Sequence, residues 1–147
     1  MIKRIFSVED SSWLAMRQAL WPQSTREEHL SEMGAWCADH GRYSVFLAYD
    51  ESGQAVGFAE AAIRSDYVNG TETSPVGFLE GLYVVPDFRR QGAARALVTA
   101  VEAWVVSSGC GELASDTDIG NSASREVHRA LGFEETERVV FFRKKIK

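Results

Sequence analysis

Residues 78–107 constrain the fold more than any other part of the chain. Residues 78–85 are mostly apolar and strand-like, and Pro86 ends the strand because proline has no N–H to donate to a sheet. Residues 92–107 then carry apolar side chains at helical spacing along one face, namely Leu97, Val98, Val101, Trp104 and Val105. The sequence therefore predicts a strand, a short turn and a helix in direct succession.

The turn between this strand and helix has the residues of an anion site. Its sequence is Arg89-Arg90-Gln91-Gly92-Ala93-Ala94. The first N–H groups of a helix lack internal partners and the helix dipole adds positive potential, so the turn suits a pyrophosphate. Arg89 offers a cation, Gly92 lets the backbone approach phosphate closely, and Ala94 is small at the helix entrance. The alternative is an ordinary surface loop with two solvated arginines.

Apolar periodicity and turn residues predict the other elements. Asp10-Ser11-Ser12 offers caps to a first helix that ends before Pro22, and residues 1–6 can form an edge strand. The remaining predictions are a helix at 26–37, strands at 45–49, 55–63, 112–117 and 137–144, a loop at 65–77, and a helix at 121–131. We therefore predict a single domain over residues 1–147, of the α/β (α+β) class.

Charge and cysteine content narrow the possible functions. With 16 Lys and Arg against 21 Asp and Glu, the net charge of −5 argues against nucleic-acid binding and is compatible with a cationic substrate. The chain has no apolar run long enough for a membrane span and no export signal, so we expect a cytoplasmic protein. Cys37 and Cys110 stand far apart without metal-ligand spacing, which indicates free thiols and no zinc.

Two motifs in order resemble one superfamily. The turn, in its strand–helix context, resembles the Gln/Arg-x-x-Gly-x-Gly/Ala signature of the Gcn5-related N-acetyltransferases (GNAT). Downstream, Asn121-x-x-Ser124-x-x-x-His128-x-x-Leu131-Gly132-Phe133 is similar to the superfamily's Asn-x-x-Ala-x-x-x-Tyr-x-x-x-Gly-Phe.

This resemblance implies the GNAT fold and its co-substrate. The fold has a mixed, mostly antiparallel sheet flanked by helices and splayed at the acetyl-CoA site. The co-substrate is acetyl-CoA, with no metal. The residues that the resemblance implies for acetyl-CoA binding are Leu82, Tyr83, Val84, Arg89, Arg90, Gln91, Gly92, Ala93, Ala94 and Asn121.

Further segments are similar to one branch, the aminoglycoside 6′-N-acetyltransferases of antibiotic resistance. They lie at residues 65–70, 74–81, 114–117 and 131–138. The resemblance implies acetyl transfer to the 6′-amino group of an aminoglycoside by direct attack in a ternary complex. It also implies an acceptor site that contains Trp21, Tyr67, Glu80, Asp116 and Glu137. Core packing for Trp21, a loop anchor for Tyr67 and a solvated edge for Glu137 are the alternatives.

The chemistry of acetyl transfer requires a neutral amine. An amine with a pKa of about 10 is only about one part in a thousand neutral at pH 7, so a base must take its proton. Asp116 and Glu80 are the candidate catalytic carboxylates, and we favour Asp116 as the base. A loop cap is the alternative for Asp116, whereas a carboxylate within an apolar strand, such as Glu80, usually has a purpose.

The general acid stays open at this point. His128 stands where the superfamily's tyrosine protonates the leaving coenzyme A thiolate, so His128 is a third catalytic candidate, with a packed or surface role as its alternative. The thiolate could also leave unaided. Asn121 could be a helix N-cap, a pantetheine contact or both.

Two other functions remain open in the sequence. One is acetyl transfer to a different amine, such as a polyamine, a small metabolite or a protein amine. The other is a non-catalytic acyl-CoA-binding module. The apolar run Val139-Val140-Phe141-Phe142 exceeds what one face of an edge strand buries, so we also predict a homodimer.

Overall fold

The computed structural model describes residues 1–9 and 11–147, without the side chain of Ser11. Asp10, a predicted helix cap, lies outside the described residues. Within them five strands form one sheet in chain order: β1 (Ile2–Arg4), β2 (Tyr43–Tyr49), β3 (Ala55–Arg64), β4 (Val76–Val84) and β5 (Leu113–Ala114). The pairs from β1 to β4 are antiparallel and β4 pairs with β5 in parallel, which confirms a mixed, mostly antiparallel sheet.

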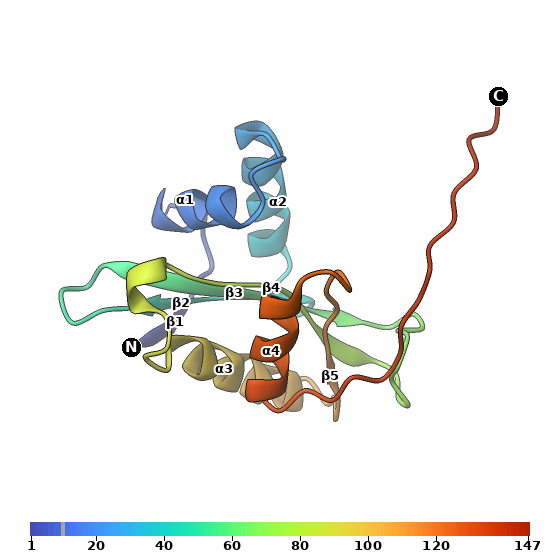
Figure 1. Ribbon diagram of the computed structural model, residues 1–147. Coiled ribbons are helices and arrows are strands. Elements are labelled where there is room, and N and C mark those ends of the chain that lie inside the picture. The colour runs from blue at the N-terminus through green and yellow to red at the C-terminus, as the bar shows by residue number, and fades with distance from the viewer. Residues whose placement is uncertain (10) are drawn as a thin grey trace.

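Helices cover both faces of this sheet (Figure 1). The helices α1 (Ser11–Leu20) and α2 (Arg26–Ala38) lie over one face, and α3 (Ala93–Ser107) lies against the other, with α4 (Ser122–Ala130) beside it. The short 3-10 turn η1 (Pro86–Phe88) links β4 to the segment before α3. The side chains of α3 that are buried in one core are the predicted ones: Leu97, Val98, Val101, Trp104 and Val105.

The second core lies between the sheet and the pair α1 and α2. Trp13 and Met16 of α1 and Met33 of α2 pack there against the sheet side chains Leu47 and Phe58. Full burial of such a side chain is worth about 1.5–3 kcal/mol, so these contacts hold the two helices on the sheet. The helix predicted before Pro22 and the one predicted at 26–37 are both confirmed.

The sheet opens between β4 and β5. These strands pair only at Gly77 with Leu113 and at Phe78 with Ala114. The Val85 amide donates to the Val56 carbonyl, and N–H directions alternate along a strand, so the Leu82 and Val84 amides point to the other edge. That edge has no partner strand in the described part of the chain, and the predicted splay is confirmed.

A β-bulge interrupts β4 at Glu80. In the pairing with β3, Gly81 stands opposite Glu60 and Leu79 stands opposite Ala61, so Glu80 has no opposite residue. Such an extra residue changes which face the following side chains occupy. Glu80 and Gly81 consequently both lie on the α1 and α2 face.

Gly81 has a second reason to be glycine. A Cβ there would lie 2.5 Å from Cη2 of Trp21, which is closer than real Cβ contacts come. The indole that follows α1 therefore lies directly against the backbone of β4. Gly81 thus lies next to the bulge and also permits tight packing against Trp21.

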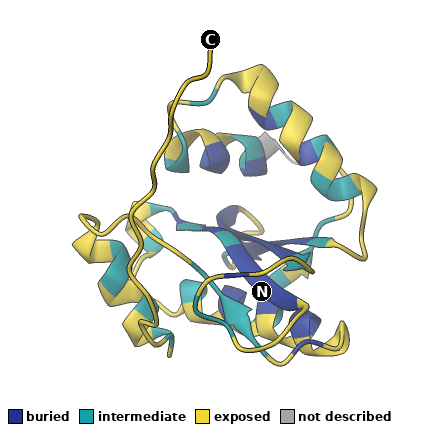
Figure 2. Cartoon of the chain, turned by 90° about the vertical axis from the view of Figure 1, so that its right-hand side faces the viewer, coloured by how far each residue is buried: buried dark blue, intermediate teal, exposed yellow. Residues whose placement is uncertain are grey.

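One strand prediction is wrong and a second is too long. Residues 137–144 form no strand in the described chain but an extended arm that leaves the body, exposed along its length (Figures 1 and 2). Their β-branched and aromatic side chains favour a strand, yet no sheet edge lies beside them to pair with. The strand predicted at 112–117 is only Leu113–Ala114, because the chain leaves β4 where the sheet opens.

Candidate active site

The segment after β4 is shaped by two left-handed residues. Arg90 has φ 63° and Gly92, the N-cap of α3, has φ 89°. The Arg89 side chain donates from Nε to the Val84 carbonyl at 2.8 Å and covers the Tyr83 ring at 5.5 Å. Gln91 donates to the Asp87 carbonyl at 3.1 Å. Arg89 thereby fixes the turn to the end of β4, and Gln91 fixes it to η1.

The backbone of this turn fits a pyrophosphate. The first turn bond into α3 runs from the Ala96 amide to the Gly92 carbonyl at 3.0 Å. Within the described residues, the amides from Arg90 to Arg95 donate to no protein acceptor. A Cβ on Gly92 would meet nothing within 4 Å, so open space lies beside Gly92, in the middle of this run of amides. Free N–H groups, a helix N-terminus and open space are what a bound phosphate requires.

The open edge of β4 leads to this turn. Its outward amides, on Leu82 and Val84, can hydrogen-bond an extended ligand as a neighbouring strand would. Across the opening, Asn121 caps α4, and its Oδ1 accepts the Ser124 amide at 3.0 Å. The N-cap role of Asn121 is therefore present, and its side-chain amide group stays available for a ligand.

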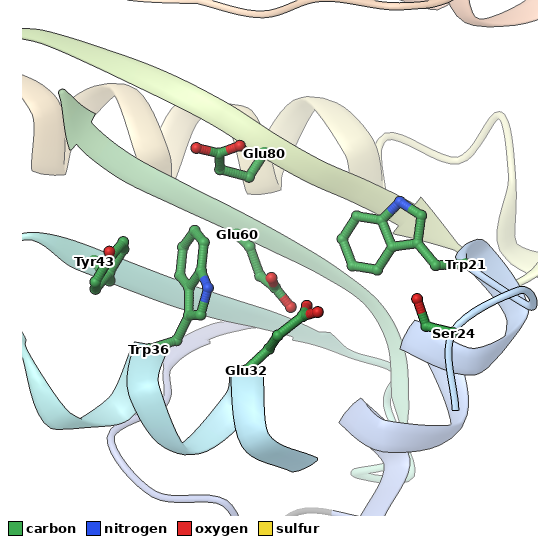
Figure 3. A pocket seen from close by; sticks show the side chains of 7 residues that line it. All are labelled: Trp21, Ser24, Glu32, Trp36, Tyr43, Glu60 and Glu80. Carbon is green, nitrogen blue, oxygen red and sulfur yellow. The ribbon is translucent and has the colours of Figure 1, made fainter. Parts of the chain in front are cut away.

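A pocket lies on the other face, between the sheet and the helices α1 and α2 (Figure 3). Its volume is about 440 Å³ and it is lined by Trp21, Ser24, Glu32, Trp36, Tyr43, Glu60 and Glu80. The lining combines aromatic faces with carboxylates. This combination suits a ligand with sugar-like rings and ammonium groups.

Glu80 enters this pocket from the bulge, paired with a cation. Arg64, the last residue of β3, donates from Nη2 to the two carboxylate oxygens at 2.9 and 2.8 Å. The Arg64 guanidinium also lies over the Phe78 ring, 3.7 Å from its centroid. About a quarter of the Glu80 side chain is exposed, 25%, so the carboxylate is held in one orientation while remaining open to a ligand.

A buried ionic network forms the floor of the pocket. Arg17 of α1 is 1% exposed and pairs with both Glu60 of β3 and Glu32 of α2. His29 Nδ1 accepts from Arg17 Nε at 3.2 Å, and Trp13 donates to Glu60 at 2.9 Å. Burial raises the pKa of Glu60, although Arg17 and the Trp13 hydrogen bond oppose that rise. One cation thus serves two carboxylates.

The sequence reasoning missed this network. Arg17 and His29 look like polar positions on the outer faces of their helices, and nothing local shows that they are buried. Glu60 was the available signal, since it is a charged residue in the middle of the apolar strand Ala55–Arg64.

Three predicted acceptor-site residues lie outside the pocket lining. Asp116 is exposed and follows β5 by two residues. The Ser115 hydroxyl lies 3.5 Å from the Leu79 carbonyl. Asp116 directly follows Ser115 and Glu80 directly follows Leu79, so the two acidic residues are the chain neighbours of this contact. Tyr67 is 74% exposed on the loop after β3.

Glu137 lies close to this loop. The side chain of Thr136, its neighbour in the chain, lies directly against Gly70 of the same loop. Tyr67 and Glu137 therefore occupy adjoining surface segments, at the point where the arm leaves the body.

His128 is half-buried on α4. Its Nε2 lies 2.8 Å from Ser115 Oγ and its Nδ1 lies 2.7 Å from the Ser124 carbonyl. The ring packs edge-on against Phe133, with the two centroids 5.2 Å apart. Both ring nitrogens are therefore held by the protein next to the opening between β4 and β5.

Comparison with known proteins decides the family. The model of the acetyltransferase (GNAT) family matches residues 12–133. The chain belongs to this GNAT family. Acetyl-CoA is accordingly its co-substrate.

Among GNAT proteins, the chain is similar to several with aminoglycoside names. It is 53% identical over 133 residues, 90% of each chain, to aminoglycoside N(6′)-acetyltransferase type 1 of Serratia marcescens. The structure of the aminoglycoside 6′-N-acetyltransferase AAC(6′)-Ih from Acinetobacter baumannii has a TM-score of 0.94 at 46% identity, covering 100% of this chain and 99% of that one. AAC(6′)-Iy bound to the bisubstrate analogue CoA-S-monomethyl-acetylneamine has a TM-score of 0.93 at 44% identity, covering 99% and 98%.

Two further observations describe this GNAT chain. Among the described residues, no three His, Cys, Asp or Glu side chains are grouped so that they could hold a metal ion. No helix in residues 1–9 and 11–147 is long and apolar enough to cross a membrane.

Proposed function

We propose that the chain transfers the acetyl group of acetyl-CoA to the 6′-amino group of an aminoglycoside antibiotic. The amine attacks directly while both substrates are bound, and the product no longer carries that cation. The observation that carries this proposal is the bulge at Glu80, because it turns a carboxylate of the acetyl-CoA strand into a pocket of aromatic and acidic side chains. The similarity to relatives named for this reaction supports the same substrate class.

Acetyl-CoA is held mainly by backbone groups. The amides of Arg90, Gln91, Gly92, Ala93 and Ala94 bind the pyrophosphate, and Arg89 fixes the turn to Val84. Leu82, Tyr83 and Val84 pair with the pantetheine arm, which Asn121 contacts from α4. An outward amide of this strand also donates to the thioester oxygen as negative charge develops on it.

The acceptor is held by side chains. Glu80 binds an ammonium group and Trp21 packs on a sugar ring inside the pocket. Tyr67 and Glu137 extend the site at its rim, where the loop after β3 meets the arm. These residues recognise a compact polycation, which an extended protein substrate is not.

Asp116 takes the proton from the attacking amine. It is exposed beside the opening of the sheet, so it can reach the amine directly or through one water, and solvent can then remove the proton. Glu80 is bound by Arg64 and serves as the ammonium site. This division of work gives each carboxylate one role.

An assay of thiol release tests the proposal against other acceptors. Kanamycin-type aminoglycosides, spermidine and a lysine peptide are supplied at equal concentration with acetyl-CoA. We expect rapid release with the aminoglycosides and little with the other two. Inactivity on all aminoglycosides would sink the substrate assignment.

One variant separates an enzyme from a mere acyl-CoA-binding module. Asp116→Asn should lower kcat about 100- to 10,000-fold while the acetyl-CoA Kd stays unchanged. The matched control is Asp118→Asn, because Asp118 is also exposed and its oxygen only accepts the Gly120 amide. A wild-type protein that binds coenzyme A without any turnover would support the module instead.

We further propose that the chain forms a homodimer through its arm. Val139, Val140, Phe141 and Phe142 are 48%, 77%, 85% and 94% exposed, and Ile146 is 84% exposed. An extended segment with this many exposed apolar side chains gains a partner by pairing with the sheet edge of a second copy. Phe142→Asp with Val140→Asp should yield monomers by light scattering, and a dimer that survives both changes would contradict the arm interface.

We also propose that residues 1–147 work as one domain in the cytoplasm, where acetyl-CoA is available. Cys37 and Cys110 are free thiols, which suits a reducing compartment. Fractionation of cells that express the chain would locate it, and recovery in the periplasm would overturn the assignment.

A further inference from the structure

The hydrogen bonds of His128 fix which nitrogen carries its proton. Nδ1 lies 2.7 Å from the Ser124 carbonyl, and a carbonyl oxygen can only accept, so Nδ1 holds a hydrogen. In the neutral ring, Nε2 is then a lone pair that accepts the Ser115 hydroxyl at 2.8 Å. In the imidazolium, Nε2–H donates to Ser115 Oγ, and the hydroxyl hydrogen is released to point elsewhere.

These bonds also prevent His128 from acting on a ligand by itself. Both ring nitrogens have protein partners and the ring edge packs on Phe133. A proton of the imidazole can therefore reach the opening of the sheet through the Ser115 hydroxyl. The other nearby acceptor for that hydroxyl, the Leu79 carbonyl, is 3.5 Å away, which is too long to hold its hydrogen firmly.

Ser115 lies at the opening of the sheet, where the proposed function puts the thioester. It follows Ala114, the last residue of β5, at the point where β5 leaves β4. It precedes Asp116 and touches the edge of β4 that continues to the outward Leu82 amide. The hydroxyl is thus at the fork that receives the thioester, one residue from the base.

From this arrangement we propose that the Ser115 hydroxyl protonates the departing thiolate of coenzyme A, with His128 as the positioning residue that supplies Ser115 with a proton. The inference rests on the acetyl transfer proposed above and extends it to the leaving group. In this chain a serine–histidine couple does what one tyrosine does in the superfamily pattern.

The step balances in atoms and charge. The carbon–sulfur bond breaks with its electron pair on sulfur. The Ser115 O–H proton passes to sulfur while the Nε2–H proton of the His128 imidazolium passes to Ser115 Oγ. The products are the thiol, an intact serine and a neutral imidazole that keeps its hydrogen on Nδ1. Solvent returns a proton to Nε2 before the next cycle.

Kinetics of four variants test the couple. Ser115→Ala should lower kcat about 100-fold, and Ser115→Thr, which keeps the hydroxyl, should restore most of the rate. His128→Gln should lower kcat about as much as Ser115→Ala does, and the double variant should lower kcat no further, because the two residues act as one unit. Ser124→Ala is the matched control, since its Oγ is 3.4 Å from Nδ1 and its carbonyl remains.

A second measurement does not depend on turnover. Ultraviolet absorbance follows the ionisation of the thiol of bound coenzyme A as the pH is raised. When the His128 imidazolium donates to Ser115 Oγ, the Ser115 hydroxyl donates to the thiolate and stabilises it, so the bound thiol should ionise at a higher pH in Ser115→Ala than in wild type. Ser124→Ala should match wild type, and Asp116 and Glu80 are unchanged in both variants.

The outcomes separate this inference from the proposed function. A Ser115→Ala protein that keeps both the wild-type kcat and the wild-type thiol titration overturns the couple, whatever the acceptor. If the wild-type protein acetylates no aminoglycoside, yet the bound thiol ionises at a higher pH in Ser115→Ala than in wild type, the proposed acceptor is overturned and the couple is supported. Additive losses in the Ser115 and His128 double variant would also count against a shared role.

Discussion

The two sides of β4 present different parts of the protein to a ligand. On the α1 and α2 face, the pocket is built from charged and aromatic side chains, with Arg17 buried beneath it at 1% exposure. At the open edge and the turn, the candidate site consists of backbone amides around Gly92. A Cβ placed on Gly92 would meet no other atom within 4 Å. One strand carries both sites because its bulge turns Glu80 to one face while its free amides stay at the edge.

This difference should decide how each candidate site responds to substitution. A site made of backbone depends on chain direction and on glycine, so the acetyl-CoA site can stay constant. A site made of side chains changes with single substitutions, so the acceptor pocket can vary. The two sites should therefore fail independently when each is damaged.

The largest effect is expected from breaking the pocket floor. Arg17→Met leaves Glu60 buried without its cation and should lower the unfolding free energy by about 3–5 kcal/mol. Acceptor binding should be lost at temperatures where the protein is still folded, while acetyl-CoA binding persists. Urea unfolding and calorimetric titration measure both.

The matched control for this change is Arg42→Met, because Arg42 is an exposed cation over Tyr43. Arg42→Met should lower the unfolding free energy by at most about 1 kcal/mol. If Arg17→Met and Arg42→Met lose unfolding free energy and acceptor affinity equally, the buried network does not support the pocket.

The next effect should appear on the backbone side. Gly92→Glu puts a carboxylate among the free amides and a Cβ on a residue with φ 89°, so acetyl-CoA should bind at least about 100-fold more weakly. Gly109→Glu is the control, because Gly109 has φ 85° and open space but lies at the other end of α3. Titration calorimetry should show normal acetyl-CoA binding for Gly109→Glu, and similar losses in both would reduce the effect to backbone strain.

A smaller effect is expected where Trp21 meets β4. Gly81→Ala would place a Cβ 2.5 Å from the indole and displace it, so the acceptor KM should rise about tenfold while the acetyl-CoA Kd holds. Gly34→Ala on α2 has nothing within 4 Å and should be neutral or slightly stabilising. Steady-state kinetics with varied acceptor decide this, and a change in acetyl-CoA affinity alone would contradict the separation of the two sites.

The smallest effect concerns pH. Because burial raises the pKa of Glu60, the folded state holds this proton more tightly than the unfolded chain. Its contribution to stability is therefore complete below the unfolded glutamate pKa and is lost as the pH rises through the raised value. Wild type should lose unfolding free energy with rising pH relative to Glu60→Gln, and parallel curves for the two proteins would refute it.

The backbone site at the turn could be predicted from the sequence, whereas the side-chain pocket could not. The turn could be predicted because a glycine, small residues and a strand ended by Pro86 encode backbone shape locally, and α3 repeats its apolar face at regular spacing. The pocket floor could not, since Arg17, His29, Glu32 and Glu60 come from three elements and meet only in the folded sheet. The strand predicted at 137–144 failed because its propensity says nothing about which edge it pairs with.

Product analysis of one acetylated aminoglycoside tests the central claim most directly. Kanamycin incubated with the enzyme and acetyl-CoA is purified and its acetylated nitrogen located by two-dimensional NMR. We predict a single acetyl group on the 6′-amino nitrogen. Acetylation at a different amine, or a mixture of sites, would contradict the proposed orientation of the acceptor in the pocket.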